Sequence, residues 1–447
     1  MNSALRIWHP FSQAAFDPPP LRVARAEGAY LYLEDGGRIL DGISSWWVNI
    51  HGHSHPQIAA AVAAQAHKLE HVIFAGFTHE SAEMLAAKLR PWVPAALTHL
   101  FFSDDGSTAV EVAIKLVVQH GFNRGCAEKC EIIALEHGYH GDTVGAMSAS
   151  DNSVFNEAFG AMRFPVRRAH SAYCYRCPVG LSRATCHIEC AQRLEQLLEE
   201  RHDRIAAVLV EPLLQGAGGM IVHPEEFLRK VRELCTRFGV FLIADEVLSG
   251  FGRTGGMFAC ERAGVVPDLM CLSKGLTGGF LPMGATLCTD AVESAFRSAD
   301  RRHTFFHGHS YTGNPLACAA ACASLEIFET EPVFDRIAAI EKIHGERLAA
   351  LRASEHVGDV RHIGSVGALE LRVEDAGYLS GIRPRLYQFF LDRGVLLRPL
   401  GNVVYVLPPY VISGQELHRI YDVIGEAIGA VLGAPKKSLG GAGKAQT

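Results

Sequence analysis

The sequence has no window of roughly 18 uncharged apolar residues, so we expect no membrane-spanning segment. Residues 1–10 contain neither a long apolar core nor a small-residue cleavage site, so a secretory signal is not expected. The formal net charge is only −6 over 447 residues, which argues against a surface that binds nucleic acid or another polyanion. No internal repeat is evident.

The chain is long enough to bury a large core, because 48% of its residues are hydrophobic and only 20% are charged. Its length predicts about two or three domains. The 12 cysteines are better explained as reduced thiols than as a disulfide framework, which favours a cytoplasmic location. Residues 434–447 are mostly Gly, Lys and Ala without an apolar pattern, so we expect a disordered tail.

The middle of the chain alternates apolar strands with amphipathic helices. This alternation predicts a mostly parallel sheet covered by helices on both faces, an α/β fold. In such sheets the site lies beyond the carboxyl ends of the strands. The expected strands are 100–102, 131–135, 205–210, 240–244 and 269–272, and the expected helices include 59–68, 80–89, 109–118 and 225–237.

The two ends of the chain have a different pattern. Residues 28–41 alternate around an Asp-Gly-Gly turn and predict a β-hairpin. After about residue 320 the pattern is that of a smaller α+β domain, with helices at 317–327, 337–351, 386–391 and 415–431 and strands at 366–371, 395–398 and 403–407. We therefore predict an N-terminal segment (1–60), a large domain (61–320), a small domain (321–433) and the tail (434–447).

Asp245 and Lys274 each stand at the end of an apolar strand, one strand apart. Alone, Asp245 could cap the next helix and Lys274 could be a solvated surface lysine. Together they fit a cofactor with an aldehyde and a basic ring nitrogen. The amine of Lys274 would form a Schiff base with the aldehyde, and the carboxylate of Asp245 would hold the ring nitrogen protonated. Glu211 falls at a third strand end.

Four weaker signals each leave two readings open. Gly106 and Ser107, between a strand and a helix, suit a phosphate or a simple helix cap. Tyr139 follows another strand and could stack on a flat cofactor or belong to the core or surface. The segment 305–315 could contact a phosphate or carboxylate, or form a capped turn. Arg398, in an apolar strand, needs an anion, which could be internal or a substrate carboxylate.

These motifs, in this order and over nearly the whole chain, resemble the class III (ω-type) aminotransferases. Within that family, the chain most resembles the members that convert 8-amino-7-oxononanoate to 7,8-diaminononanoate in biotin biosynthesis. The segments that support this are Ile7–Phe11, Ser44–Trp47, Tyr139–Thr143, Gln215–Met220 and Arg398–Pro399 with Pro408–Tyr410. Generic ω-aminotransferases usually lack the Trp-Trp pair and the opening Trp-His-Pro.

The resemblance implies a fold type I homodimer that binds pyridoxal 5'-phosphate in an active site shared between subunits. Lys274 would be the Schiff-base lysine and Asp245 the partner of the ring nitrogen, with a ping-pong reaction. Gly106 and Ser107 would hold the phosphate of the cofactor, and Tyr139 would pack on its ring. His309 and Ser310 would reach the phosphate from the second subunit. The substrate pocket would be lined by Trp46, Gly308 and Arg398.

The amino donor is left open between S-adenosylmethionine and lysine. Phe11 stands where users of S-adenosylmethionine carry tyrosine, and residues 307–313 and 279–282 look more like members that use lysine. Two other functions also remain. One is a broader ω-amino-acid or diamine aminotransferase, against which Trp46 and Trp47 argue. The other is a cofactor-binding regulatory protein without catalysis, which an intact Lys274 and Asp245 disfavour.

Four cysteines raise a separate hypothesis. Cys174, Cys177, Cys186 and Cys190 form two short-spaced pairs in an insertion before the strand that ends at Glu211. Such pairs are typical of a zinc or iron–sulfur site. The alternative is a set of reduced thiols in a surface insertion.

Overall fold

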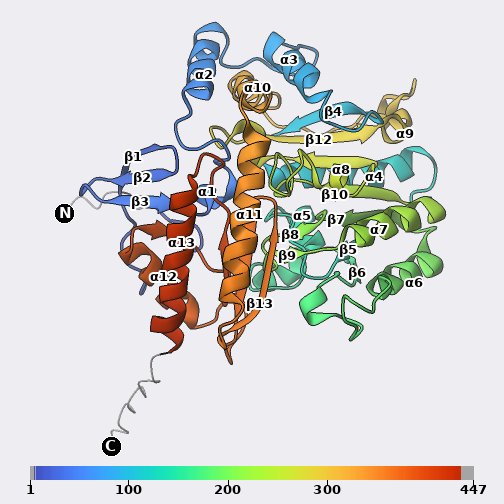
Figure 1. Cartoon of the computed structure of the whole chain (residues 1–447). Coiled ribbons are helices and arrows are strands. Elements are labelled where there is room, and N and C mark those ends of the chain that lie inside the picture. Colours follow the sequence, from blue (N-terminus) through green and yellow to red (C-terminus); the bar gives the residue numbers. More distant parts are fainter. Residues whose placement is uncertain (1–4, 6, 434–447) are drawn as a thin grey trace, which may run out of the picture.

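The computed structural model describes residue 5 and residues 7–433 (Figure 1). The predicted disordered tail, 434–447, lies outside the described residues. Within the described part of the chain, no helix is both long and apolar enough to cross a membrane.

A seven-stranded sheet forms the centre of the molecule, in the order β4-β12-β11-β10-β7-β5-β6. Six strands run parallel, and β12 runs antiparallel to both of its neighbours. The predicted α/β architecture is therefore confirmed. The strands are β4 (Leu97–Ser103), β5 (Glu131–Leu135), β6 (Arg167–Ala169), β7 (Ile205–Val210), β10 (Phe241–Asp245), β11 (Leu269–Leu272) and β12 (Gly284–Thr289).

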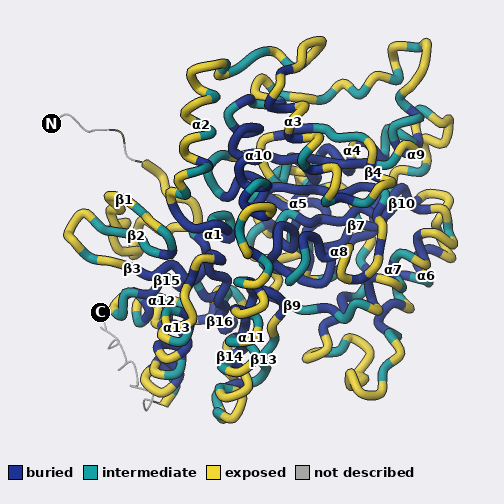
Figure 2. The backbone as a smooth tube through the Cα atoms, turned by 45° about the horizontal axis from the view of Figure 1, so that its top comes forward, coloured by how far each residue is buried: buried dark blue, intermediate teal, exposed yellow. Residues whose placement is uncertain are grey.

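Successive residues of each central strand are buried against opposite layers, because side chains alternate across a strand. In β10, Leu242 and Ala244 join the main core, which includes α6 (Gln192–Arg201) and α7 (Glu225–Phe238). Ile243 joins a second core built on α4 (Gly106–Asn123). The strands therefore lie deeply buried between two helical layers (Figure 2). This double coverage explains why they are apolar throughout.

Further helices lie around the sheet. They are α2 (Pro56–Lys68), α3 (Glu80–Leu89), α5 (Val144–Ala149), α8 (Ala259–Arg262), α9 (Asp290–Glu293) and α10 (Pro315–Thr330). Residue 320, the predicted domain boundary, lies inside α10, and the division into domains stays a prediction. A two-stranded ribbon of β8 (Leu214–Gln215) and β9 (Ile221–Val222) lies near the carboxyl end of β7.

The C-terminal part contains the antiparallel sheet β13-β14-β16 and three long helices. The strands are β13 (Val357–Ile363), β14 (Val366–Leu371) and β16 (Val403–Val406), and the helices are α11 (Val333–Leu351), α12 (Ile382–Asp392) and α13 (Gly414–Ala427). Helix α13 begins with a capping box in which the side chains of Ser413 and Glu416 each accept a hydrogen bond from the other residue's backbone amide.

The N-terminal sheet is completed by a strand from the other end of the chain. The predicted hairpin forms from β2 (Tyr30–Leu33) and β3 (Arg38–Asp41), with β1 (Val23–Glu27) beside β2. The fourth strand, β15 (Val395–Leu396), pairs parallel with β3. The predicted strand 395–398 is thus too long, and Arg398 lies in the loop after β15.

A left-handed turn, α1 (Ser44–Trp47), follows β3. All four of its residues have φ between 43° and 78°, a region that ordinarily costs about 1–2 kcal/mol per residue. Buried Asp41 holds the turn by accepting hydrogen bonds from Ser45 Oγ and the Ile43 amide. Fully buried Arg253 donates to the Trp47 carbonyl from outside the turn. Backbone strain held in this way commonly marks a functional position.

Candidate active site

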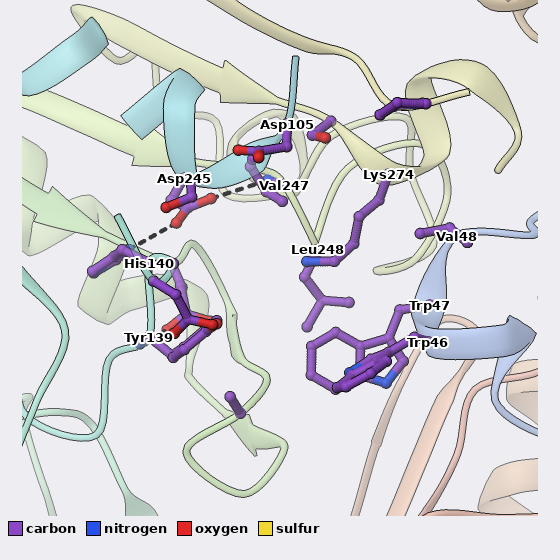
Figure 3. A pocket seen from close by; sticks show the side chains of 18 of the residues that line it. Trp46, Trp47, Val48, Asp105, Tyr139, His140, Asp245, Val247, Leu248 and Lys274 are labelled. Carbon is purple, nitrogen blue, oxygen red and sulfur yellow. Dashed lines mark hydrogen bonds and ion pairs between the residues drawn. The ribbon is translucent and has the colours of Figure 1, made fainter. Parts of the chain in front are cut away.

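A cavity of about 700 Å³ opens at the carboxyl ends of the central strands. Three charged side chains reach it from neighbouring strands: Glu211 follows β7, Asp245 ends β10, and Lys274 stands two residues after β11. The carboxyl ends of parallel strands lie at the same edge of a sheet, so these three side chains come together there, as the sequence predicted. Lys274 and Asp245 project into this cavity with Tyr139, Trp46 and Trp47 around them (Figure 3).

Asp245 is fixed by two hydrogen bonds. One oxygen lies 2.7 Å from His140 Nδ1, and the other accepts from the Val247 amide at 3.1 Å. Asp245 is only 4% exposed. Nε2 of His140 is buried and has no partner among the described residues. The carboxylate is therefore held in one orientation, suited to a stationary positive charge in the cavity.

Lys274 begins the short helix η4 (Lys274–Thr277), and its φ of 45° is unusual for a residue with a side chain. Its ammonium nitrogen lies 5.2 Å from the ring centre of Trp47. Burial lowers the pKa of this amine, and the carboxylates of Asp245 and Glu211 partly oppose that effect. A lowered pKa increases the uncharged fraction of the amine, which is the nucleophilic form.

The first turn of α4 forms a cradle of backbone amides. Gly106 and Ser107 open this 18-residue helix, where amides lack partners within the helix and the dipole favours an anion. A Cβ on Gly106 would lie 2.5 Å from Val247, and one on Gly141 would lie 2.2 Å from Ser107 Oγ. The hydroxyl of Ser107 is 2.7 Å from that of Thr143. Only glycine allows these loops to approach so closely.

Tyr139 lies on the wall of the cavity, and its backbone amide donates to Glu211 at 3.0 Å. Burial raises the pKa of the Tyr139 phenol, with Asp142 adding to the effect, so its hydroxyl stays protonated. Burial and the charge of Asp245 raise the pKa of Glu211 to about 7, although nearby His140 opposes this. Glu211 also accepts a hydrogen bond from the Gly216 backbone amide, so its carboxylate binds the two loops that contain Tyr139 and Gly216.

Arg398 lies at the other end of the cavity, with its guanidinium 4.6 Å from the ring centre of Trp46. Trp46 in turn contacts Phe11 edge to face at 5.2 Å. No described carboxylate forms an ion pair with Arg398, so its planar fork of donors is available to an anion in the cavity. The long aromatic wall beside it suits an aliphatic chain that ends in a carboxylate.

Three predicted residues lie apart from this cavity in the single chain. Gly308 and Ser310 are exposed and His309 is half-buried, and none of them lines the cavity. The same segment exposes Phe306 by 76% and Tyr311 by 65%. The other seven predicted site residues, Trp46, Gly106, Ser107, Tyr139, Asp245, Lys274 and Arg398, all line the one cavity.

The family model described as aminotransferase class-III matches residues 11–428. The chain belongs to the class III aminotransferases. The predicted family is confirmed. The predicted enzyme class, a transaminase that depends on pyridoxal 5'-phosphate, is confirmed as well.

The chain is also similar to individual members over nearly its full length. The adenosylmethionine-8-amino-7-oxononanoate aminotransferase of Geobacter sulfurreducens is 43% identical, over 96% of this chain and 96% of that protein. The enzyme of the same name from Synechococcus elongatus is 46% identical, over 96% of this chain and 99% of that protein. The crystal structure of such an enzyme from Methanocaldococcus jannaschii is 37% identical, with a TM-score of 0.88 over 94% of this chain and 96% of that one. A PLP-bound amine transaminase from an uncultivated Pseudomonas species is 33% identical, with a TM-score of 0.90 over 96% and 99%.

The residues of the cavity fit this cofactor. The amide cradle of α4 suits a phosphate, the carboxylate of Asp245 suits a protonated ring nitrogen, and Lys274 would supply the amine that bonds the aldehyde. Tyr139 and Val247 offer surfaces for a flat ring, since both line the same cavity. Pyridoxal phosphate would supply an aldehyde that accepts an amino group and a cationic ring that withdraws electrons from the reacting carbon.

Several residues of the cavity carried no role in the sequence predictions. His140, Val247 and Leu248 line the cofactor end, and Phe155, Tyr378 and Tyr405 line the substrate end. His140 could have been suspected because it stands beside Tyr139 in a glycine-bounded loop after a strand. Tyr378 and Tyr405 give no comparable signal, because they come from a separate part of the chain whose placement depends on tertiary packing.

Proposed function

We propose that this enzyme transfers an amino group to 8-amino-7-oxononanoate and forms 7,8-diaminononanoate, a step of biotin biosynthesis. The observation that carries the proposal is full-length identity of 43–46% to relatives named for this reaction. The cavity supports it, because an amine and a carboxylate for the cofactor lie at one end and a stacked arginine lies at the other.

Each residue has a defined part in this reaction. Lys274, freed when the donor amine replaces it, would carry a proton away from the donor carbon and return it at the acceptor carbon. Asp245, oriented by His140, would keep the ring nitrogen protonated. Arg398 would bind the carboxylate of the acceptor, while Trp46 and Trp47 exclude water along its hydrocarbon chain.

The decisive measurement is turnover of 8-amino-7-oxononanoate by the purified holoenzyme with S-adenosylmethionine and lysine supplied separately. We expect 7,8-diaminononanoate to form with one of the two donors. The relatives' names favour S-adenosylmethionine, whereas Phe11 favours lysine. If the enzyme turned over β-alanine, 4-aminobutyrate or putrescine but did not accept 8-amino-7-oxononanoate, it would instead be the broader ω-aminotransferase.

Replacing Arg398 by lysine tests the substrate end of the cavity. Lysine keeps the charge but loses the planar fork and the stacking on Trp46, so we expect KM for 8-amino-7-oxononanoate to rise about 10- to 100-fold. The value of kcat should change much less. Arg393→Lys is the matched control, since Arg393 also stacks on an aromatic ring, Phe389, but outside the cavity. An unchanged KM in R398K would remove Arg398 from the site.

We also propose a cytoplasmic homodimer in which His309 and Ser310 reach the partner's phosphate cradle. All 12 cysteines are free, which suits a reducing compartment. The exposed rings of Phe306 and Tyr311 flank the two residues, and exposed Ile73 and Phe77 add apolar surface. Sedimentation equilibrium of the holoenzyme tests this, and a monomer with full activity would contradict it.

A further inference from the structure

The insertion between β6 and β7 contains four cysteines that none of the catalytic roles requires. It runs from about residue 171 to residue 191 and contains only two single 3₁₀ turns, Cys174–Arg176 and Glu189–Ala191. A segment of this length without regular structure is uncommon in a compact domain and is usually functional or otherwise stabilised.

All four thiols of the insertion border the same small cavity. Cys174, Cys177, Cys186 and Cys190 line a single cavity of about 20 Å³, whose other walls are mostly apolar. Cys190 is buried, Cys177 and Cys186 are half-buried, and Cys174 is exposed. The four thiols thus border one shared space as a possible ligand set.

The surroundings of the thiols suit a metal–thiolate centre. Arg183 Nη1 lies 3.9 Å from Cys186 Sγ, and its other terminal nitrogen lies 3.1 Å from Glu226. A guanidinium beside the sulfurs would offset the surplus negative charge of four thiolates around a divalent ion. The apolar walls, which include Val179, Leu181 and Ile188, limit the access of water.

We propose that Cys174, Cys177, Cys186 and Cys190 bind one structural zinc ion. Two short-spaced cysteine pairs are the usual ligand set of a closed tetrahedral zinc site. The cavity that they border is small, about 20 Å³, which favours a single ion over a larger iron–sulfur cluster. The four sulfurs would draw closer together when they bind the ion, because among the described residues only His99, Asp290 and Glu293 already hold their ligand atoms within 4.8 Å of one another. Arg297 pairs with both acids of that other set.

The zinc site would fix one wall of the neighbouring substrate region. Tyr173 donates to buried Glu370 of β14 at 2.6 Å, and Arg176 pairs with the same carboxylate at 2.5 Å. Tyr173 directly precedes Cys174, and Arg176 directly precedes Cys177. Tyr173 and Arg176 also line a cavity of about 390 Å³ that shares Tyr139 and Tyr378 with the active-site cavity. The metal would therefore hold Tyr173 and Arg176 in position against the C-terminal part of the chain.

The test measures metal content in the holoenzyme produced in zinc-supplemented medium. We expect about one zinc ion per chain in the wild type, retained through gel filtration, and less than about a tenth of an ion in Cys174→Ser/Cys177→Ser. Cys126→Ser/Cys130→Ser is the matched control, because it removes two exposed thiols outside the cluster and should keep the zinc. Cofactor absorbance confirms that each variant is folded.

A second measurement covers the case in which the cysteine variant fails to fold. Titration of the folded Cys126→Ser/Cys130→Ser protein, which lacks the two exposed thiols outside the cluster, with a mercurial should release about one zinc ion as about four thiols react. Zinc below about a tenth of an ion per chain in the wild type would overturn the proposal. So would iron in place of zinc, or disulfides among these four cysteines found by mass spectrometry.

Discussion

Lys274→Ala is expected to lower turnover at least about 10³-fold, because one side chain supplies both the bond to the cofactor aldehyde and the proton transfer at the reacting carbon. Borohydride should fix the cofactor to the wild-type chain at position 274 and not to the variant. Both the positive φ of Lys274 and the lowered pKa of its amine are features of a residue held for this purpose.

The control for this experiment is Lys342→Ala, which removes a lysine whose side chain is 78% exposed and does not line the cavity. It should keep wild-type turnover. Added methylamine should restore part of the activity of K274A, since a free amine can take over proton transfer when the cavity is otherwise intact. Borohydride labelling of another lysine would contradict the assignment.

Asp245→Asn is expected to lower kcat about 10²- to 10³-fold, the loss typical of removing one electrostatic contact to a reacting group. The amide is nearly the same size as the carboxylate and can still accept from the Val247 amide. It cannot stabilise a protonated ring nitrogen, so the cofactor ring would withdraw electrons less strongly. The substitution also places an amide beside Nδ1 of His140, where the carboxylate now lies at 2.7 Å.

The readout that separates this role from a structural one is the absorbance of the bound cofactor. In D245N we expect the spectrum to shift and its pH dependence to change, while the thermal stability of the apoenzyme stays close to that of the wild type. Asp290→Asn, at a side chain that is 64% exposed, is the matched control. A wild-type spectrum and kcat in D245N would show that Asp245 does not contact the ring nitrogen.

The sequence predicted the parallel sheet well because its strands are buried on both faces. Leu242, Ile243 and Ala244 form a continuous apolar run, and the polar residues that end such runs, Asp245 and Glu211, do meet in one cavity. Strand β12 was not predicted. Its segment, Gly284–Thr289, contains small residues and is separated from β11 only by the short helix η4 and a loop, so neither length nor alternation distinguishes it from a loop.

Other features depend on contacts distant in sequence and gave no local signal. A glycine-rich segment, Gly250–Gly255, follows Asp245 in the sequence. Its Arg253 proves to be buried, where it donates to the carbonyls of Trp47 and Pro408 and stacks on Tyr410. Likewise, the left-handed turn of Ser44–Trp47 contains no glycine that would predict it. A buried arginine and a strained turn are stable only in the finished tertiary structure.

The pairing of β3 with β15 sets the order in which the protein can mature on the ribosome. Residues 38–41 obtain this neighbouring strand only after residues 395–396 have been synthesised. The turn that carries Trp46 and Trp47 begins directly beyond β3, so the aromatic wall stays unfinished on a nascent chain that already contains Asp245 and Lys274. A partly translated chain would then hold both ionisable groups without being able to turn over substrate, and catalytic competence would arrive late in synthesis.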